Sequence, residues 1–170
     1  MSIATNYLES ALKEFHSYKG LGDKTFAQLN EEQMHFQPNE ECNSIAINIQ
    51  HMHGNMLSRW INFLEEDGEK EWRQRDAEFE IKNLSREQLI TLWEEGWKVV
   101  FSALEPITKE DLKKIISIRS KSLTVVEAIN RQLAHYSYHV GQIVLLGKCV
   151  KGKEWQTLSV PRGRSLQFNK

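Results

Sequence analysis

The apolar residues of this chain recur three and four positions apart along most of its length, which is the spacing that gives an α-helix one apolar face. The pattern covers four segments, at about residues 7–29, 44–68, 85–106 and 124–151. Amphipathic helices bury their apolar faces against one another, and 170 residues have the size of one domain. The sequence therefore predicts an all-α fold, a four-helix bundle formed by a single domain over residues 1–170.

The starts of three of these helices carry capping residues. Ser44 is a suitable N-cap for the second helix. In "SREQ" and "TVVE", the pairs Ser85 with Gln88 and Thr124 with Glu127 form the capping-box pattern, in which the two side chains bond each other's backbone N–H groups. We therefore expect helices to begin directly after residues 44, 85 and 124.

The segments between the helices are long. Gly20 and Gly22 weaken the first helix and are expected to bend it. The stretch "GEKEWRQRDAEFEIKN", residues 68–83, is polar and is interpreted as a solvated connection, although links longer than roughly 12–15 residues are usually functional or crossover segments. The alternating stretch "IISIRSKSL" predicts an extended hairpin packed against the helices, and residues 154–170 predict an irregular tail.

Charge and composition exclude several classes of function. The net charge is −1 with both signs interspersed, so the chain lacks the basic stripe of a nucleic-acid-binding protein. No apolar run approaches the roughly 20 residues that span a bilayer, and the first residues do not resemble a signal peptide. Cys42 and Cys149 form no disulfide framework, which fits a reducing compartment. We expect a cytoplasmic protein that binds neither nucleic acid nor membrane.

Two histidines in the last predicted helix are candidates for metal ligands. His135 and His139 are four residues apart, so both lie on one face of that helix. The alternative is that they are ordinary packed or hydrogen-bonded histidines. A third ligand is available in the second helix, where His51 and His53 point to nearly opposite faces. The helical phase slightly favours His53, and the sequence pattern alone leaves this choice open.

Two longer segments resemble the signature segments of the DinB-like superfamily, a family of metal-binding helical bundles. They are "NSIAINIQHMHGNMLSRW" and "TVVEAINRQLAHYSYHVGQI", and the similarity extends to "DGEKEW" and "SVPRG". The chain is most similar to a branch of that superfamily whose function is unknown. The resemblance implies a four-helix bundle of unusual connectivity with one divalent metal ion, nickel or zinc, held by three histidines. Its His-x-x-Gly-Asn pattern matches residues 51–55, so the implied ligands are His51, His135 and His139.

The resemblance also implies a function. Three protein ligands leave a coordination position open for water or a small thiol. Members of the superfamily include thiol-dependent transferases, so a thiol S-transferase is expected before a hydrolase, and a homodimer is expected. The alternative is a bundle that binds metal without catalysis and acts in binding or stress response. No general base is identifiable. Polar residues that could line a pocket, or could equally bond between helices, are Asn48, Asn55, Arg59, Arg131 and Tyr138.

Overall fold

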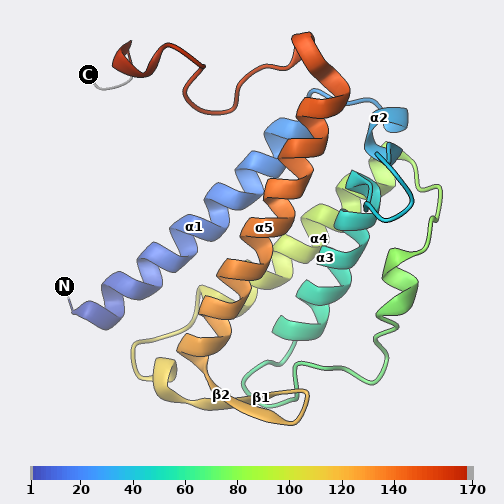
Figure 1. Cartoon of the computed structure of the whole chain (residues 1–170). Coiled ribbons are helices and arrows are strands. Elements are labelled where there is room, and N and C mark those ends of the chain that lie inside the picture. Colours follow the sequence, from blue (N-terminus) through green and yellow to red (C-terminus); the bar gives the residue numbers. More distant parts are fainter. Residues whose placement is uncertain (1, 168–170) are drawn as a thin grey trace.

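The computed structural model of the protein describes residues 2–167. These residues form a mainly helical structure with one two-stranded sheet (Figure 1). The helices are α1 (Ile3–Phe26), α2 (Glu31–His35), α3 (Ile45–Trp60), α4 (Arg86–Leu104) and α5 (Val125–Lys151), and the strands are β1 (Ile115–Ile118) and β2 (Lys121–Thr124). Short 3₁₀ helices lie at Asp76–Phe79, Asp111–Lys113, Gly152–Glu154 and Ser165–Gln167. The all-α expectation therefore holds for the main body, and the hairpin is a small addition to it.

The four long helices pack around one core. The main contacts join α3 to α4, α1 to α5 and α3 to α5. Figure 1 shows the hairpin at one end of this helical body and the segment after α5 at the opposite end. No helix of the described residues has both the length and the apolar character required to cross a membrane.

A cluster of aromatic side chains fills the core and fixes α3 relative to α5. Phe15, Trp97 and Tyr136 are fully buried, and the ring of Tyr136 lies 5.6 Å from that of Trp97. The Trp60 indole donates a hydrogen bond of 2.9 Å to the Tyr136 hydroxyl, which donates one of 3.3 Å to Asn55. Buried tyrosines and tryptophans usually have such partners, although Nε1 of Trp97 has none. This chain of bonds joins α3 to α5 beside the histidines.

The three predicted helix starts are confirmed. Ser44 caps α3, and both capping boxes form, with Ser85 at the start of α4 and Thr124 at the start of α5. A further capping box, Asn30 with Gln33, starts the short helix α2, which the apolar spacing did not predict. The end predicted near Gly68 is wrong, because α3 ends at Trp60 and the chain then turns through residues 61–66.

The expected hairpin is confirmed. β1 and β2 pair antiparallel, and Ile116 and Ile118 are buried against the helical body. Arg119 and Ser120 have φ values of 55° and 58°, and their N–H groups donate to the carboxylate of Asp67 at 2.8 Å each. The bonds that this single carboxylate accepts attach the hairpin turn to the segment that follows α3. The predicted irregular tail is also observed as far as residue 167, and its last three residues lie outside the described part.

The two glycines of α1 occupy different environments, and neither interrupts the helix. A Cβ atom at Gly22 would lie 2.3 Å from Cζ2 of the buried Trp93, whereas one at Gly20 would meet nothing within 4 Å.

We predict that Gly22→Ala destabilises the protein by about 1–3 kcal/mol through overpacking. Gly20→Ala should instead stabilise it by up to about 1 kcal/mol through helix propensity. Urea denaturation of both variants measures this, and equal effects of the same sign would contradict it.

Candidate metal centre

Three histidines from two helices meet between α3 and α5. His51 comes from α3, and His135 and His139 lie one turn apart on α5. Their ring centroids are 4.7–5.4 Å apart, and each ring offers one nitrogen such that these three atoms all lie within 4.8 Å of one another. His51 and His139 are only 4% and 5% exposed, and His135 is partly buried. The three side chains are positioned to bind a metal ion.

The spacing of two nitrogens matches that expected around one ion. Nε2 of His51 and Nε2 of His135 are 3.3 Å apart. Two nitrogens bound to one tetrahedral zinc ion, each at about 2.0–2.1 Å, would be about 3.3–3.4 Å apart. The ligand atoms of His51 and His135 are therefore already at the distance that a shared ion requires.

A buried carboxylate orients His51. Nδ1 of His51 donates to Oε2 of Glu78 at 2.9 Å, since a carboxylate can only accept. Arg73 in turn donates to both oxygens of Glu78, at 2.7 and 2.9 Å. Burial alone would raise the pKa of Glu78, but the hydrogen bonds from Arg73 and His51 outweigh it and hold that pKa below its usual value. Glu78 is thus an anion that keeps the proton of His51 on Nδ1 and leaves the Nε2 lone pair free. This is the carboxylate–histidine arrangement of many metal sites.

Amide oxygens orient His139 in the same way. Its Nδ1 lies 2.9 Å from Oδ1 of Asn48 and 3.0 Å from Oε1 of Gln142, and both oxygens accept. The orientation of the Asn48 amide is set by its nitrogen, which donates to the carbonyl of Ser44. Nε2 of His139 is therefore the unprotonated nitrogen, and it is buried with no hydrogen-bond partner.

Without a metal ion, hydrogen bonds alone give partners to fewer of the ring nitrogens of the three histidines than a bound ion would. In that arrangement Nε2 of His135 donates to Nε2 of His51 at 3.3 Å. Nε2 of His139 and Nδ1 of His135 both stay buried without a partner. Buried polar atoms without partners are rare and destabilising. A metal ion bound to the three Nε2 atoms would give Nε2 of His139 a partner and would leave only Nδ1 of His135 without one, so the residues present fit such an ion.

The site favours neutral imidazoles, which is the protonation state that metal binding requires. Burial lowers the pKa of His135 to about 3, and the neighbouring histidines and the charges of Arg59 and Arg73 act in the same direction. Burial lowers the pKa of His139 to about 4, and repulsion from a protonated His51 would act in the same direction. Both rings are therefore neutral at physiological pH, and protons compete only weakly for their lone pairs.

The structure separates the two candidate histidines of α3. His53 lies on the side that faces α4, where its Nε2 is 3.3 Å from Glu95 without hydrogen-bond geometry. It does not join the cluster of His51, His135 and His139. The helical-phase argument for His53 thus points to the wrong side of α3. The match to the His-x-x-Gly-Asn pattern selects the histidine that meets the other two.

The other polar residues that the sequence suggested for a pocket are partly buried between helices and partly exposed on the surface. Asn48 bonds to His139, and Asn55 accepts the bond from Tyr136. Arg59 is buried in an ion pair with Glu69. Tyr138 is half-exposed, with its ring 4.2 Å from that of His139, and Arg131 is exposed. Asn48 and Asn55 are thus inter-helix bonding residues, and Tyr138 and Arg131 lie on the surface near the histidines.

Sequence reasoning missed Glu78 and Arg73. Both belong to residues 68–83, and the interpretation of that segment as a solvated connection is wrong at these positions. Glu78 is 7% exposed and the side chain of Arg73 only 2%. Gly54 was the available signal, because a Cβ atom there would lie 2.3 Å from Oε1 of Glu78. The glycine of the His-x-x-Gly-Asn pattern thus leaves room for the carboxylate that orients His51.

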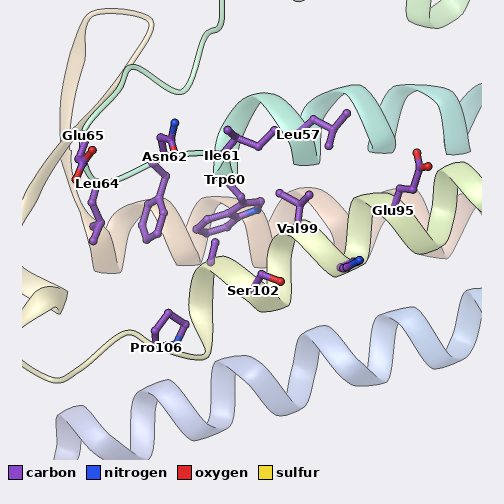
Figure 2. Close-up of a pocket in the computed structure, with 13 residues that line it drawn as sticks. Leu57, Trp60, Ile61, Asn62, Leu64, Glu65, Glu95, Val99, Ser102 and Pro106 are labelled. Atoms are coloured by element: carbon purple, nitrogen blue, oxygen red, sulfur yellow. The ribbon is translucent and has the colours of Figure 1, made fainter.

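An apolar groove lies elsewhere on the molecule. Figure 2 shows it between the end of α3 and α4, with a volume of about 710 Å³. Apolar side chains such as Leu57, Ile61, Val99 and Pro106 line it, and Glu65 and Glu95 lie toward its two ends. None of the three histidines contributes to it. The candidate metal centre and this groove are therefore separate features of the molecule.

Comparison with known protein families gives one match, which covers most of the chain. The chain belongs to the family described as Protein of unknown function (DUF1572), whose model matches residues 2–164. That range contains all three histidines as well as Arg73 and Glu78. Among curated proteins and solved structures, nothing matches the chain.

The contact between Gly54 and Glu78 gives a test that changes no ligand. We predict that Gly54→Ala displaces the Glu78 carboxylate and lowers the affinity for divalent metal about 10- to 100-fold, the usual cost of losing such an outer partner. Gly141→Ala is the matched control. It also lies close to a histidine, two residues after His139, but a Cβ atom there meets nothing within 4 Å. Competition with a chromophoric chelator measures both affinities, and an unchanged affinity in Gly54→Ala would contradict the role of Glu78.

The pKa values of the histidines predict how the metal-free protein responds to acid. The pKa of His135 in the folded protein is about 3 and that of His139 about 4, below the roughly 6.5 of an unfolded chain. As the pH falls below about 6.5, the unfolded chain therefore takes up protons that the folded protein does not. The free energy of unfolding should decrease, on the order of 1–2 kcal/mol per histidine by pH 5.

Denaturation of chelator-treated protein between pH 7 and pH 5 measures this decrease. The double variant His135→Gln/His139→Gln should lose less stability over the same range. Parallel pH profiles for the two proteins would refute the assignment of neutral, buried rings.

Proposed function

We propose that the protein binds one divalent metal ion, zinc or nickel, through His51, His135 and His139, and that it is a thiol-dependent S-transferase. The observation that carries the proposal is the convergence of three histidines, of which His51 and His139 are buried and have their Nδ1 atoms bonded to fixed oxygens. Three neutral ligands with a free position are typical of catalytic rather than structural zinc sites. The resemblance to the DinB-like superfamily, with its four-helix topology and its thiol-dependent members, supports the same function.

The metal ion would supply Lewis acidity, which holds a bound thiol in its thiolate form near neutral pH. The chain's own contribution is positional. Glu78 and Asn48 hold the rings of His51 and His139 so that both Nε2 lone pairs face the same space. With the ion bound, the thiol would lose its proton to solvent, its sulfur would form a bond to a carbon electrophile, and the leaving group would depart with the electron pair of the broken bond. No side chain is assigned as a general base.

The second candidate is a helical bundle that binds the metal ion without catalysis and acts in binding or in stress response. The burial of His51 and His139 favours it, because the described surface pockets do not include these residues. A hydrolase would use the same open position for water. The homodimer and the cytoplasmic location also stay predictions.

The test begins with metal content and proceeds to thiol binding. Protein purified without a metal-affinity tag should contain one divalent ion per chain by elemental analysis. His51→Ala and His139→Ala should lose it, and His53→Ala should retain it. The cobalt-substituted protein should then develop a near-ultraviolet thiolate band with bacillithiol, cysteine or glutathione, and the same thiol should accelerate the loss of a model electrophile.

Each outcome separates the candidates. His135→Ala should abolish the acceleration. A thiolate band without turnover would favour the non-catalytic bundle. Absence of metal from the wild-type protein, even after incubation with zinc or nickel, would remove both candidates and leave a hydrogen-bonded histidine cluster.

A further inference from the structure

The apolar groove between the end of α3 and α4 also carries charge (Figure 2). Side chains such as Leu57 and Val99 form its apolar walls. Its charged lining residues are Glu65, Glu95 and Lys98, so the described lining has one net negative charge. A groove of about 710 Å³ with this lining suits a segment that is both apolar and positively charged.

The two acids of the groove are not neutralised by their own chain. Figure 2 shows Glu65 and Glu95 toward its opposite ends. Among residues 2–167, no lysine or arginine forms an ion pair with either carboxylate. The side chain of Glu95 is 57% exposed. Both ends of the groove therefore attract cations.

The segment that follows α5 has the complementary composition. Residues 155–167 contain Arg162 and Arg164 and no acidic residue. Both arginines are exposed, and neither forms an ion pair within the described part of the chain. Val160 is 44% exposed and Leu166 is 86% exposed. Segment 160–167 thus presents apolar side chains and two unpaired cations to its surroundings.

A turn gives segment 160–167 a defined shape. The N–H of Arg164 donates to the carbonyl of Pro161 at 3.0 Å, and Gly163 between them has a φ of 79°, which glycine adopts without strain. Within residues 2–167, the hydrogen bonds of this segment join only its own members. It can therefore bind another surface without losing bonds to its own helices, and its turn is already formed.

The segment and the groove lie toward opposite ends of one molecule. Gln156 exchanges hydrogen bonds of 2.8 and 3.1 Å with Gln28, which holds the chain before the segment beside the end of α1. The groove adjoins the hairpin, since Leu64 and Glu65 also line a small cavity with residues of β1. Figure 1 shows the hairpin and the segment after α5 at opposite ends. In two antiparallel copies related by a two-fold axis, these unlike ends lie side by side.

We propose that two copies of the chain form a two-fold symmetric dimer in which segment 160–167 of each copy occupies the apolar groove of the other. Val160 and Leu166 meet the apolar walls, and the two arginines meet the two acids. The dimer contains this contact twice, so the first contact raises the effective concentration for the second. The metal centre takes no part in this contact, so the inference is independent of the proposed function.

Charge reversal on each side tests the contact. The tail variant carries Arg162→Glu with Arg164→Glu, and the groove variant carries Glu65→Lys with Glu95→Lys. By analytical ultracentrifugation, the wild type should be a dimer. Each variant alone should have a dimer dissociation constant at least about tenfold higher, because like charges then face one another. An equimolar mixture of the two variants should return to within about threefold of the wild type, since both contacts of the mixed dimer are again complementary.

A matched control separates this contact from an effect of net charge. Glu9→Lys with Glu14→Lys reverses two exposed acids of α1, so it changes the net charge as much as the groove variant does. This control should dimerise as the wild type does. Mixed with a fluorescently labelled tail variant, it should not restore dimer formation by the labelled protein. Restoration by the control as strong as that by the groove variant would overturn the location.

A second pair of variants tests the apolar part of the contact. Leu166→Ser should raise the dimer dissociation constant, whereas Leu145→Ser should leave it unchanged, because Leu145 is 60% exposed on α5 outside both surfaces. Circular dichroism checks that every variant keeps its helices. A wild type that is monomeric at about 100 μM would overturn the proposal, whether its groove is empty or filled by its own segment. A dimer that persists unchanged in both charge variants would overturn it as well.

Discussion

The buried series Arg73–Glu78–His51 is the interaction on which the site depends. A carboxylate is costly to bury unless it is paired, and the two-pronged contact from Arg73 makes the burial of Glu78 tolerable. Glu78 then determines which nitrogen of His51 carries the proton. Removing one member of such a series leaves a buried charge without its partner, which is far more destabilising than the absence of both. The segment between α3 and α4 is therefore part of the site and not only a connection.

The rest of the fold holds α3 and α5 at the distance that the histidines require. Tyr136 lies between the aromatic core and the site, with its hydroxyl bonded to Trp60 and Asn55 and its ring 5.6 Å from that of His135. Any shift of α5 along α3 would break these bonds as well as separate the histidines. Core packing and site geometry are thus set by the same pair of helices, so that a stable fold also presents a preformed site.

Local patterns predicted the parts of this structure that local interactions determine. Capping boxes gave the starts of α4 and α5, and the spacing of His135 and His139 gave their common face, because each depends on residues three or four apart. The end of α3 was not predictable in this way, since it occurs where the chain turns at Asn62, a residue with a φ of 50°. Glu78 was missed because it meets His51 across a separation of 27 residues that includes the irregular chain after α3, where no periodicity relates the two. The choice of His51 over His53 came from a resemblance between sequences and not from helical phase.

Gly54 shows that a missing side chain can be part of a site's specification. Its lack of a Cβ atom is what allows the Glu78 carboxylate to lie against α3. A search for related sites that counts only histidines would accept chains in which a larger residue at this position excludes the acid. A better criterion requires the pair of histidines on the last helix together with three further residues. These are a histidine, a glycine three residues after it, and an acidic residue further along the chain. Under that criterion, chains that keep the three histidines but replace the glycine would be separated as a group whose first histidine is oriented in another way.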